Sequence, residues 1–251
     1  MSSIPKKVSD RFLKKTKKFQ RILKNANDRD INEADTVTIV GDIFTEVFGY
    51  DKYEEITSEF AVRGTYCDLA IQIDDNIKYL IEVKAIGTDL KESHLRQAVN
   101  YGANKGVQWI ILTNGILWEI YFVRFEKPVR EEKLYSMNFL ELNPRKIKDQ
   151  EYLFLLCKEG INKAAIDKYQ EHIRSVNKFS IAAILFDESV INIIRRKLKK
   201  IALDLKIDNL EIEDILKNEV IKRDVIEGEE AEKGMLQAKK AISKTTSEQR
   251  N

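Results

Sequence analysis

Three charged side chains in the first half of the chain are spaced so that they could share one site. Asp68 follows the apolar start of a strand-like segment, and the next such segment carries Glu82-Val83-Lys84. Because side chains alternate along a strand, Glu82 and Lys84 share a face, which Asp68 joins if the two strands pair. Two neighbouring carboxylates repel each other, and a hard cation such as Mg²⁺ between them removes the repulsion. The pattern predicts a divalent metal site.

A cation held in this way catalyses phosphoryl transfer. It polarises a phosphate and lowers the pKa of a bound water, while Lys84 could orient that water or stabilise charge developing on the phosphate. The competing interpretation is a solvated strand face with a cross-strand ion pair, which is common and nearly neutral in energy. Apolar neighbours on both sides, Leu80-Ile81 and Ala85-Ile86, favour a central strand of the sheet. Burying charged side chains there is costly unless a partner or ligand compensates them.

The elements that must position these residues follow from hydrophobic periodicity and turn signals. The predicted elements are a helix over residues 30–48, strands over 54–62, 66–73 and 77–85, a helix over 90–104, and strands over 109–112 and 117–123. Asp30 or Asn32 can cap the first helix, and Gly49 ends it. Asn114-Gly115 is a strong hairpin signal between the last two strands. The order is α-β-β-β-α-β-β, and residues 134–142 could add an edge strand.

The chain divides into four predicted segments. These are a basic N-terminal arm or helix over 1–29, the α/β core over 30–143, a helical region over 144–226, and a charged tail, expected to be flexible, over 227–251. The net charge is only +2, but residues 1–24 hold nine Lys/Arg against one acid, Asp10. A basic arm suits phosphate contact and is also a common solubilising tail. Lys14, Lys15 and Lys18 are its candidate nucleic-acid contacts.

Composition excludes several classes of protein. Hydrophobic residues make up 43% of the chain, enough for a core that is stable without disulfides or structural metal ions. Cys67 and Cys157 lie far apart without a CxxC or Cys/His cluster, so we expect both reduced and buried rather than in a disulfide or zinc site. No apolar run approaches the roughly 20 residues that span a bilayer, so we expect a cytoplasmic protein.

Asp68 followed by Glu82-Val83-Lys84 resembles the catalytic signature of the PD-(D/E)XK nucleases. The segment 32–36 resembles the opening of the first helix in type I restriction R subunits, and Gln97 with Tyr101 resembles the QxxxY motif of those subunits and their RecB-like relatives. The resemblance covers residues 30–125. It implies a three-layer restriction-endonuclease-like α/β core, α-β-β-β-α-β with a mixed central sheet, followed by a helical C-terminal extension.

The resemblance also implies roles for individual residues. The implied catalytic residues are Glu33, Asp68, Glu82, Lys84, Gln97 and Tyr101, and the implied metal set is Asp68, Glu82, Val83 and Glu33. Plain alternatives remain for two of them. Glu33 could simply complement the helix dipole, and Tyr101 could be a core residue of an amphipathic helix.

Two departures from the family matter. Cys67 stands where the superfamily has the proline of its name, a position without chemistry. The sequence contains no GxxxxGK[ST] loop, so the motor of type I R subunits is absent from it. We therefore expect a free-standing nuclease, or a nuclease-derived module that relies on a partner.

Other basic residues are weaker candidates. Arg63 and Lys91 flank the predicted cleft and could bind phosphate, whereas His94 and His172 are more simply incidental. A second basic cluster, residues 195–200, could contact DNA or coat a helix that packs or dimerises.

The leading functional hypothesis is a Mg²⁺-dependent deoxyribonuclease, an endonuclease or exonuclease in restriction, phage defence or DNA processing, with Mn²⁺ as a substitute metal. RNA is the weaker substrate. The alternative is a nuclease-fold module with little or no activity that binds nucleic acid or assembles with a restriction or defence partner. A homodimer through the C-terminal helices is part of this hypothesis, and no membrane association is expected.

Overall fold

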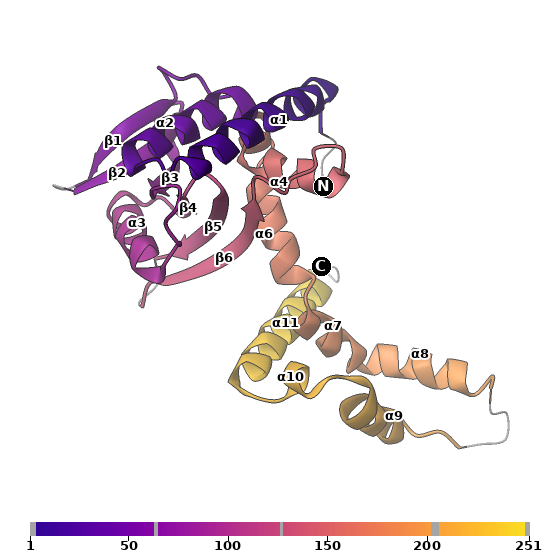
Figure 1. Ribbon diagram of the computed structural model, residues 1–251. Coiled ribbons are helices and arrows are strands. Elements are labelled where there is room, and N and C mark those ends of the chain that lie inside the picture. Colours follow the sequence, from indigo (N-terminus) through magenta and orange to yellow (C-terminus); the bar gives the residue numbers. More distant parts are fainter. Residues whose placement is uncertain (1–3, 63–64, 126–127, 202–205, 249–251) are drawn as a thin grey trace. The chain divides into compact units, whose positions relative to one another are not determined.

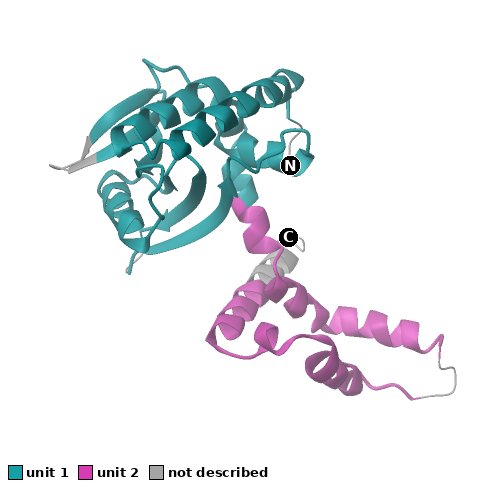
Figure 2. Ribbon diagram, viewed as in Figure 1, with its two compact units in different colours: residues 1–169 teal, residues 170–251 magenta. Residues whose placement is uncertain are grey.

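The computed structural model describes residues 4–62, 65–125, 128–201 and 206–248. The chain divides into two compact units, residues 1–169 (unit 1) and 170–251 (unit 2), which are coloured separately in Figure 2. Unit 1 contains the sheet, and unit 2 is built from helices. The mixed α/β class and the helical C-terminal region agree with the sequence-based prediction.

The described residues of unit 1 form a six-stranded sheet in the order β1-β2-β3-β4-β5-β6. Its strands are β1 (Ile56–Val62), β2 (Thr65–Ile73), β3 (Asn76–Val83), β4 (Trp109–Thr113), β5 (Leu117–Arg124) and β6 (Arg130–Asn138). Only β3 and β4 pair in parallel among these neighbours, and the other pairs are antiparallel. The predicted mixed sheet is confirmed, and β6 supplies the expected sixth strand, beginning somewhat before residue 134.

Helices cover both faces of this sheet. They are α1 (Lys6–Asp28), α2 (Glu33–Ile43) with its π-helical continuation η1 (Phe44–Phe48), α3 (Glu92–Lys105), α4 (Ile147–Leu156), α5 (Lys158–Ile161) and α6 (Ala165–Ser175), the last of which ends in unit 2. Figure 1 shows α3 on one side of the sheet and α1 and α2 on the other. The helices α4 and α5, which the sequence analysis grouped with the C-terminal region, lie in unit 1.

The basic N-terminal segment is a packed helix. Val8, Phe12, Phe19 and Leu23 are buried along α1 at helical spacing, so its lysines occupy the opposite, exposed face. Arg11 anchors the helix with a bidentate ion pair to Glu159, at 2.8 and 2.7 Å. Its guanidinium also donates to the backbone carbonyls at residues 47 and 48, where η1 ends.

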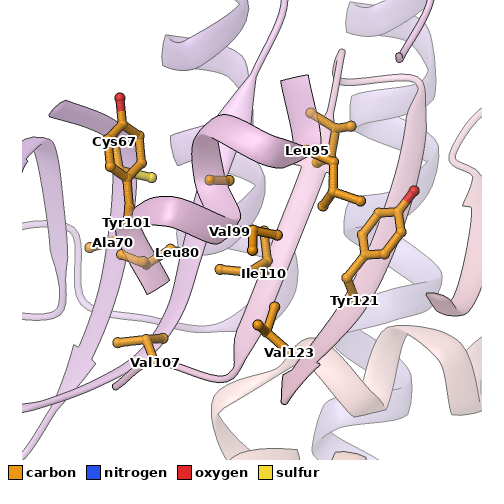
Figure 3. Close-up of a cluster of buried hydrophobic side chains, with 12 residues drawn as sticks. Cys67, Ala70, Leu80, Leu95, Val99, Tyr101, Val107, Ile110, Tyr121 and Val123 are labelled. Atoms are coloured by element: carbon orange, nitrogen blue, oxygen red, sulfur yellow. The ribbon is translucent and has the colours of Figure 1, made fainter. Parts of the chain in front are cut away.

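The core lies on both sides of the sheet. On the α3 side, a cluster of buried side chains joins α3 to β2, β3, β4 and β5, and Figure 3 shows it from Ala70 and Leu80 to Val123. On the other side, the fully buried Trp118 packs against Phe44 and Phe48, with ring centroids 5.7 Å from each. Both β3 and β4 are therefore covered on two faces, which explains their apolar sequences.

Unit 2 contains α7 (Lys178–Leu185), α8 (Glu188–Leu198), α9 (Asn209–Ile215), η2 (Leu216–Val220), α10 (Arg223–Ile226) and α11 (Glu229–Glu248). Ile191, Ile212 and Leu216 form its small buried cluster. Within the charged segment beyond residue 227, Glu229–Glu248 form α11, where Ala231 and Ala238 are buried. Gly234 of α11 lies so close to the ring of Phe179 that a Cβ there would be 2.6 Å away.

Both cysteines are free and buried, as the sequence predicts. The Cys67 thiol donates to the backbone carbonyl of Ile81, and burial raises its pKa to about 12, so it is an unreactive core residue. No helix among the described residues has the length and apolar character needed to cross a membrane.

Candidate active site

The candidate site lies at the C-terminal end of β3. In the β2–β3 register, Leu69 pairs with Ile81, which sets Asp68 opposite Glu82 on neighbouring strands. A hydrogen bond from the backbone N–H of Val83 to Asp68 Oδ2, at 2.7 Å, fixes this arrangement. The two acids therefore share one face of the sheet, as their spacing predicts.

Glu82 is the most enclosed acid of the site. Its side chain is only 1% exposed, because α3 covers this face of β3. One carboxylate oxygen, Oε1, lies 2.8 Å from Lys84 Nζ, and the other, Oε2, is buried without a hydrogen-bond partner in the structure. Burial raises the pKa of Glu82 to about 7, and the charge of Asp68 adds to the shift while Lys84 opposes it.

Asp68 is half-buried, and its pKa also lies above the usual value. Burial is the main cause, and the negative charge of Glu33 contributes, whereas the hydrogen bond from Val83 and the charge of Lys84 act in the opposite direction. Two neighbouring carboxyls thus both resist ionisation in the absence of a cation. This is the electrostatic condition that favours binding of a divalent metal.

Lys84 follows β3 directly and connects the two sides of the site. Its backbone N–H donates to the carbonyl of Thr113 on β4, and its ammonium group contacts Glu82 and, at 3.4 Å, Glu33 Oε2. The Lys84 side chain is 14% exposed. Burial alone would lower the pKa of Lys84, but the hydrogen bond and charge of Glu82 outweigh that effect and raise it. The lysine therefore stays cationic.

Glu33 is the first residue of α2. Asn32 caps this helix by accepting a hydrogen bond from the backbone N–H of Asp35, one of the two capping residues that the sequence suggests. The Glu33 side chain is 48% exposed and contacts Lys84 from the side of α2. Its position at a helix start satisfies the helix dipole as well.

The loop after Lys84 is held by residues that sequence reasoning did not assign to the site. Asn114, in the β4–β5 turn, donates from Nδ2 to the carbonyls of Ile86 and Thr88, and its Oδ1 accepts two backbone hydrogen bonds of its own turn. The sequence marked Asn114-Gly115 as a hairpin, and that hairpin is confirmed. Its contact with the site loop links residues 28 positions apart, which no local signal reveals.

The remaining predicted residues lie on α3. Gln97 Nε2 donates to the hydroxyl of Tyr101 at 3.0 Å, as expected for residues four apart on one helix face. The ring of Tyr101 is buried in the core cluster, and its hydroxyl points out of that cluster in Figure 3. The pKa of His94, in the first turn, lies below its usual value. Burial is the main cause, and the positive charge of the nearby Lys84 is the second. Lys91 is the exposed N-cap residue of the same helix.

The predicted nucleic-acid contacts fall into three groups. Arg63 lies outside the described residues. Lys15 and Lys18 both bind Glu46 of η1, at 2.7 and 2.6 Å, and the hydrogen bonds of these lysines lower its pKa. Lys14 is exposed on α1.

The donor set fits a hard cation bound with part of its water shell. Asp68 and Glu82 offer carboxylate oxygens, including the unpartnered Oε2, and Val83 can offer only its backbone carbonyl. The described part of the chain has no cluster of three or more His, Cys, Asp or Glu side chains placed to hold a metal ion. Mg²⁺ requires no such cluster, since it typically keeps several waters and binds through one or two carboxylates. The charge of Glu33 is directed to Lys84 in this structure.

The comparison with protein families concerns the segment that carries these residues. Residues 42–136 match the family described as type I restriction enzyme R protein N terminus (HSDR_N). The matched segment is less than half of the chain. It includes β1 to β5, most of β6, α3 and the residues Asp68, Glu82 and Lys84, and it begins after Glu33. No curated protein and no solved structure matched the chain.

Proposed function

We propose that the chain is a metal-dependent deoxyribonuclease of the PD-(D/E)XK type that hydrolyses phosphodiester bonds in a restriction or defence system. The observation that carries the proposal is the Glu82 carboxyl, buried with an unpartnered oxygen and positioned opposite Asp68. A buried acid of this kind is costly unless a ligand compensates it. The similarity of residues 42–136 to the R protein N terminus supports a restriction context.

In this proposal Asp68 and Glu82 hold Mg²⁺ or Mn²⁺, with the backbone carbonyl of Val83 beside them. The bound cation supplies a Lewis acid and lowers the pKa of a water. Lys84, kept cationic by Glu82, donates to a non-bridging phosphate oxygen or orients the attacking water. Glu33 holds the Lys84 ammonium on the side of α2. Gln97 and Tyr101 complete the wall of the site on α3 through their mutual hydrogen bond.

The test is a timed incubation of the purified full chain with linear, circular and single-stranded DNA, in Mg²⁺, in Mn²⁺ and in EDTA. The test variant is Glu82→Gln, which keeps the volume of the side chain but removes its charge. The matched control is Glu119→Gln, because Glu119 is a partly buried strand acid that pairs with Lys133 outside the site. We expect metal-dependent cleavage by the wild type and the control, and none by Glu82→Gln. Equal cleavage by all three proteins would refute the assignment.

A second candidate is a nucleic-acid-binding or assembly module without hydrolysis. It is favoured by Glu33, whose carboxylate contacts Lys84 and not the two other acids, so that among the described residues no group of three acids is placed to hold a metal. Calorimetric titration with Mn²⁺ separates the two proposals. Heat of binding that disappears in Asp68→Asn supports the nuclease, whereas no heat together with salt-sensitive DNA binding supports the module.

A further inference from the structure

The exposed face of α1 carries a row of basic residues that the site geometry leaves unexplained. Lys14, Lys17, Arg21 and Lys24, here called the α1 stripe, are all exposed and follow one another at intervals of three, four and three residues. Residues at this spacing share one helix face. They occupy about 15 Å of helix at a rise of about 1.5 Å per residue. The sequence has no acid between Asp10 and Asp28, which stand four residues before Lys14 and four after Lys24 on the same helix, and neither aspartate forms an ion pair with the stripe in the structure.

Two neighbouring lysines of α1 have their charge neutralised by an acid of η1, whereas the stripe does not. Lys15 and Lys18 both bind Glu46. Among the described residues, no acidic side chain pairs with any member of the stripe, and Arg21 makes only a long hydrogen bond to the carbonyl of Lys17. Like charges at this spacing destabilise a helix by a few tenths of a kcal/mol per pair. An uncompensated row of this kind is the expected footprint of a polyanion.

The stripe sits on a helix that is held firmly in place. Phe12 and Phe19 bury the opposite face of α1, and Gln20 donates to the carbonyls of Phe139, Leu140 and Leu142 at the end of β6. Because the backbone is fixed by these contacts, the four charges are already arranged in a row before any ligand binds. Such preorganisation reduces the entropic cost of binding.

The C-terminal end of α1 packs against the turn and the loop that border the candidate site. Leu23 packs so closely on Gly115 that a Cβ there would lie 3.1 Å from Leu23 Cδ2. Asn114, which precedes Gly115 in the chain, donates hydrogen bonds to the loop that follows Lys84. In the turn after α1, Asp30 lies against Gly87 of the same loop, with its Oδ1 2.5 Å from where a Gly87 Cβ would be. α1 therefore leads directly to the loop that positions the catalytic lysine.

We propose that the α1 stripe binds the sugar-phosphate backbone of duplex DNA and directs it to the site at the end of β3. DNA as the ligand rests on the proposed nuclease function, whereas the placement of the contact rests on α1 itself. The contact carries no base information, because phosphate contacts position a duplex without reading its sequence. It predicts binding that is strongly salt-dependent and largely independent of sequence.

The experiment measures binding of the full chain to a labelled DNA duplex in EDTA, so that cleavage does not interfere. The stripe variant carries Lys14→Gln, Lys17→Gln, Arg21→Gln and Lys24→Gln. The matched control carries Arg196→Gln, Lys197→Gln, Lys199→Gln and Lys200→Gln, which removes the same charge from exposed residues at the end of α8. Urea unfolding of each variant verifies that it is folded.

Each neutralised phosphate contributes about 0.9 to the slope of log K against log salt concentration. We expect the stripe variant to lose about 3 to 4 from this slope and more than tenfold in affinity, while the control stays within twofold of the wild type. Wild-type affinity in the stripe variant, or a loss confined to the α8 control, overturns the proposal. The nuclease proposal is scored separately, by whether Mg²⁺ supports cleavage that depends on Glu82.

Discussion

The raised pKa of Glu82 predicts an unusual dependence of stability on pH. The Glu82 carboxyl takes up its proton near pH 7 in the folded chain and near 4.5 in a solvated reference. Between these values the folded state binds more protons than the unfolded state, so the free energy of unfolding decreases as pH rises. Integrating from pH 5 to pH 8 gives a loss of about 2.5 kcal/mol from this one group.

The assay compares the wild type with Glu82→Gln by urea unfolding in EDTA, followed by tryptophan fluorescence, since Trp118 is fully buried. Contributions from other groups largely cancel in the difference between the two proteins. We expect the wild type to lose about 2.5 kcal/mol relative to the variant between pH 5 and pH 8. The matched control, Glu119→Gln, should show no such trend. A difference between wild type and Glu82→Gln that stays constant with pH would refute the burial argument.

Three further predictions concern the supports of the site, each measured as the change in free energy of unfolding in urea. Asn114→Ala should lower the free energy of unfolding by about 2–3 kcal/mol, because it leaves the carbonyls of Ile86 and Thr88 without their hydrogen-bond donor. A loss below about 0.5 kcal/mol, as expected for a substitution on the surface, would contradict this role. Gly115→Ala should cost clearly more than Gly106→Ala, since both have a positive φ but only Gly115 contacts Leu23, and equal costs would show that the contact is relaxed. Arg11→Met should cost about 2 kcal/mol by leaving Glu159 and two backbone carbonyls without their charged donor, compared with under about 1 kcal/mol for Lys52→Met at the more exposed pair with Asp42, and similar values would argue against the anchoring of α1.

Local sequence signals were sufficient for the sheet and for the strand residues of the site. The strands of unit 1 are rich in β-branched and aromatic residues between turn residues, and these features depend on neighbours in the chain. The period of two along a strand was enough to place Glu82 opposite Asp68 once β2 and β3 were assumed to pair. The position of Glu33 was different, because it came from family resemblance and not from spacing.

Features formed by distant segments could not be predicted in this way. The basic composition of α1 obscured the helical spacing of Phe12, Phe19 and Leu23, which reveals which lysines face outward. The hydrogen bonds from Asn114 to the loop after Lys84 depend on how a hairpin turn meets another loop in three dimensions. The pairing of Lys15 and Lys18 with Glu46 likewise depends on the packing of α1 against η1, so the charge pattern of the sequence alone did not reveal it.

The most direct test of the central claim is the initial rate of DNA cleavage in Mg²⁺ by the wild type and by Lys84→Gln, on the DNA form that the wild type cleaves fastest. Lys84 contacts both Glu82 and Glu33, and electrostatic stabilisation by one such group is worth about a hundredfold or more in rate. We expect cleavage by the wild type that EDTA abolishes, and a loss of at least about a hundredfold in the folded variant. Cleavage within a few-fold of the wild type in Lys84→Gln would contradict the claim that this site performs the reaction.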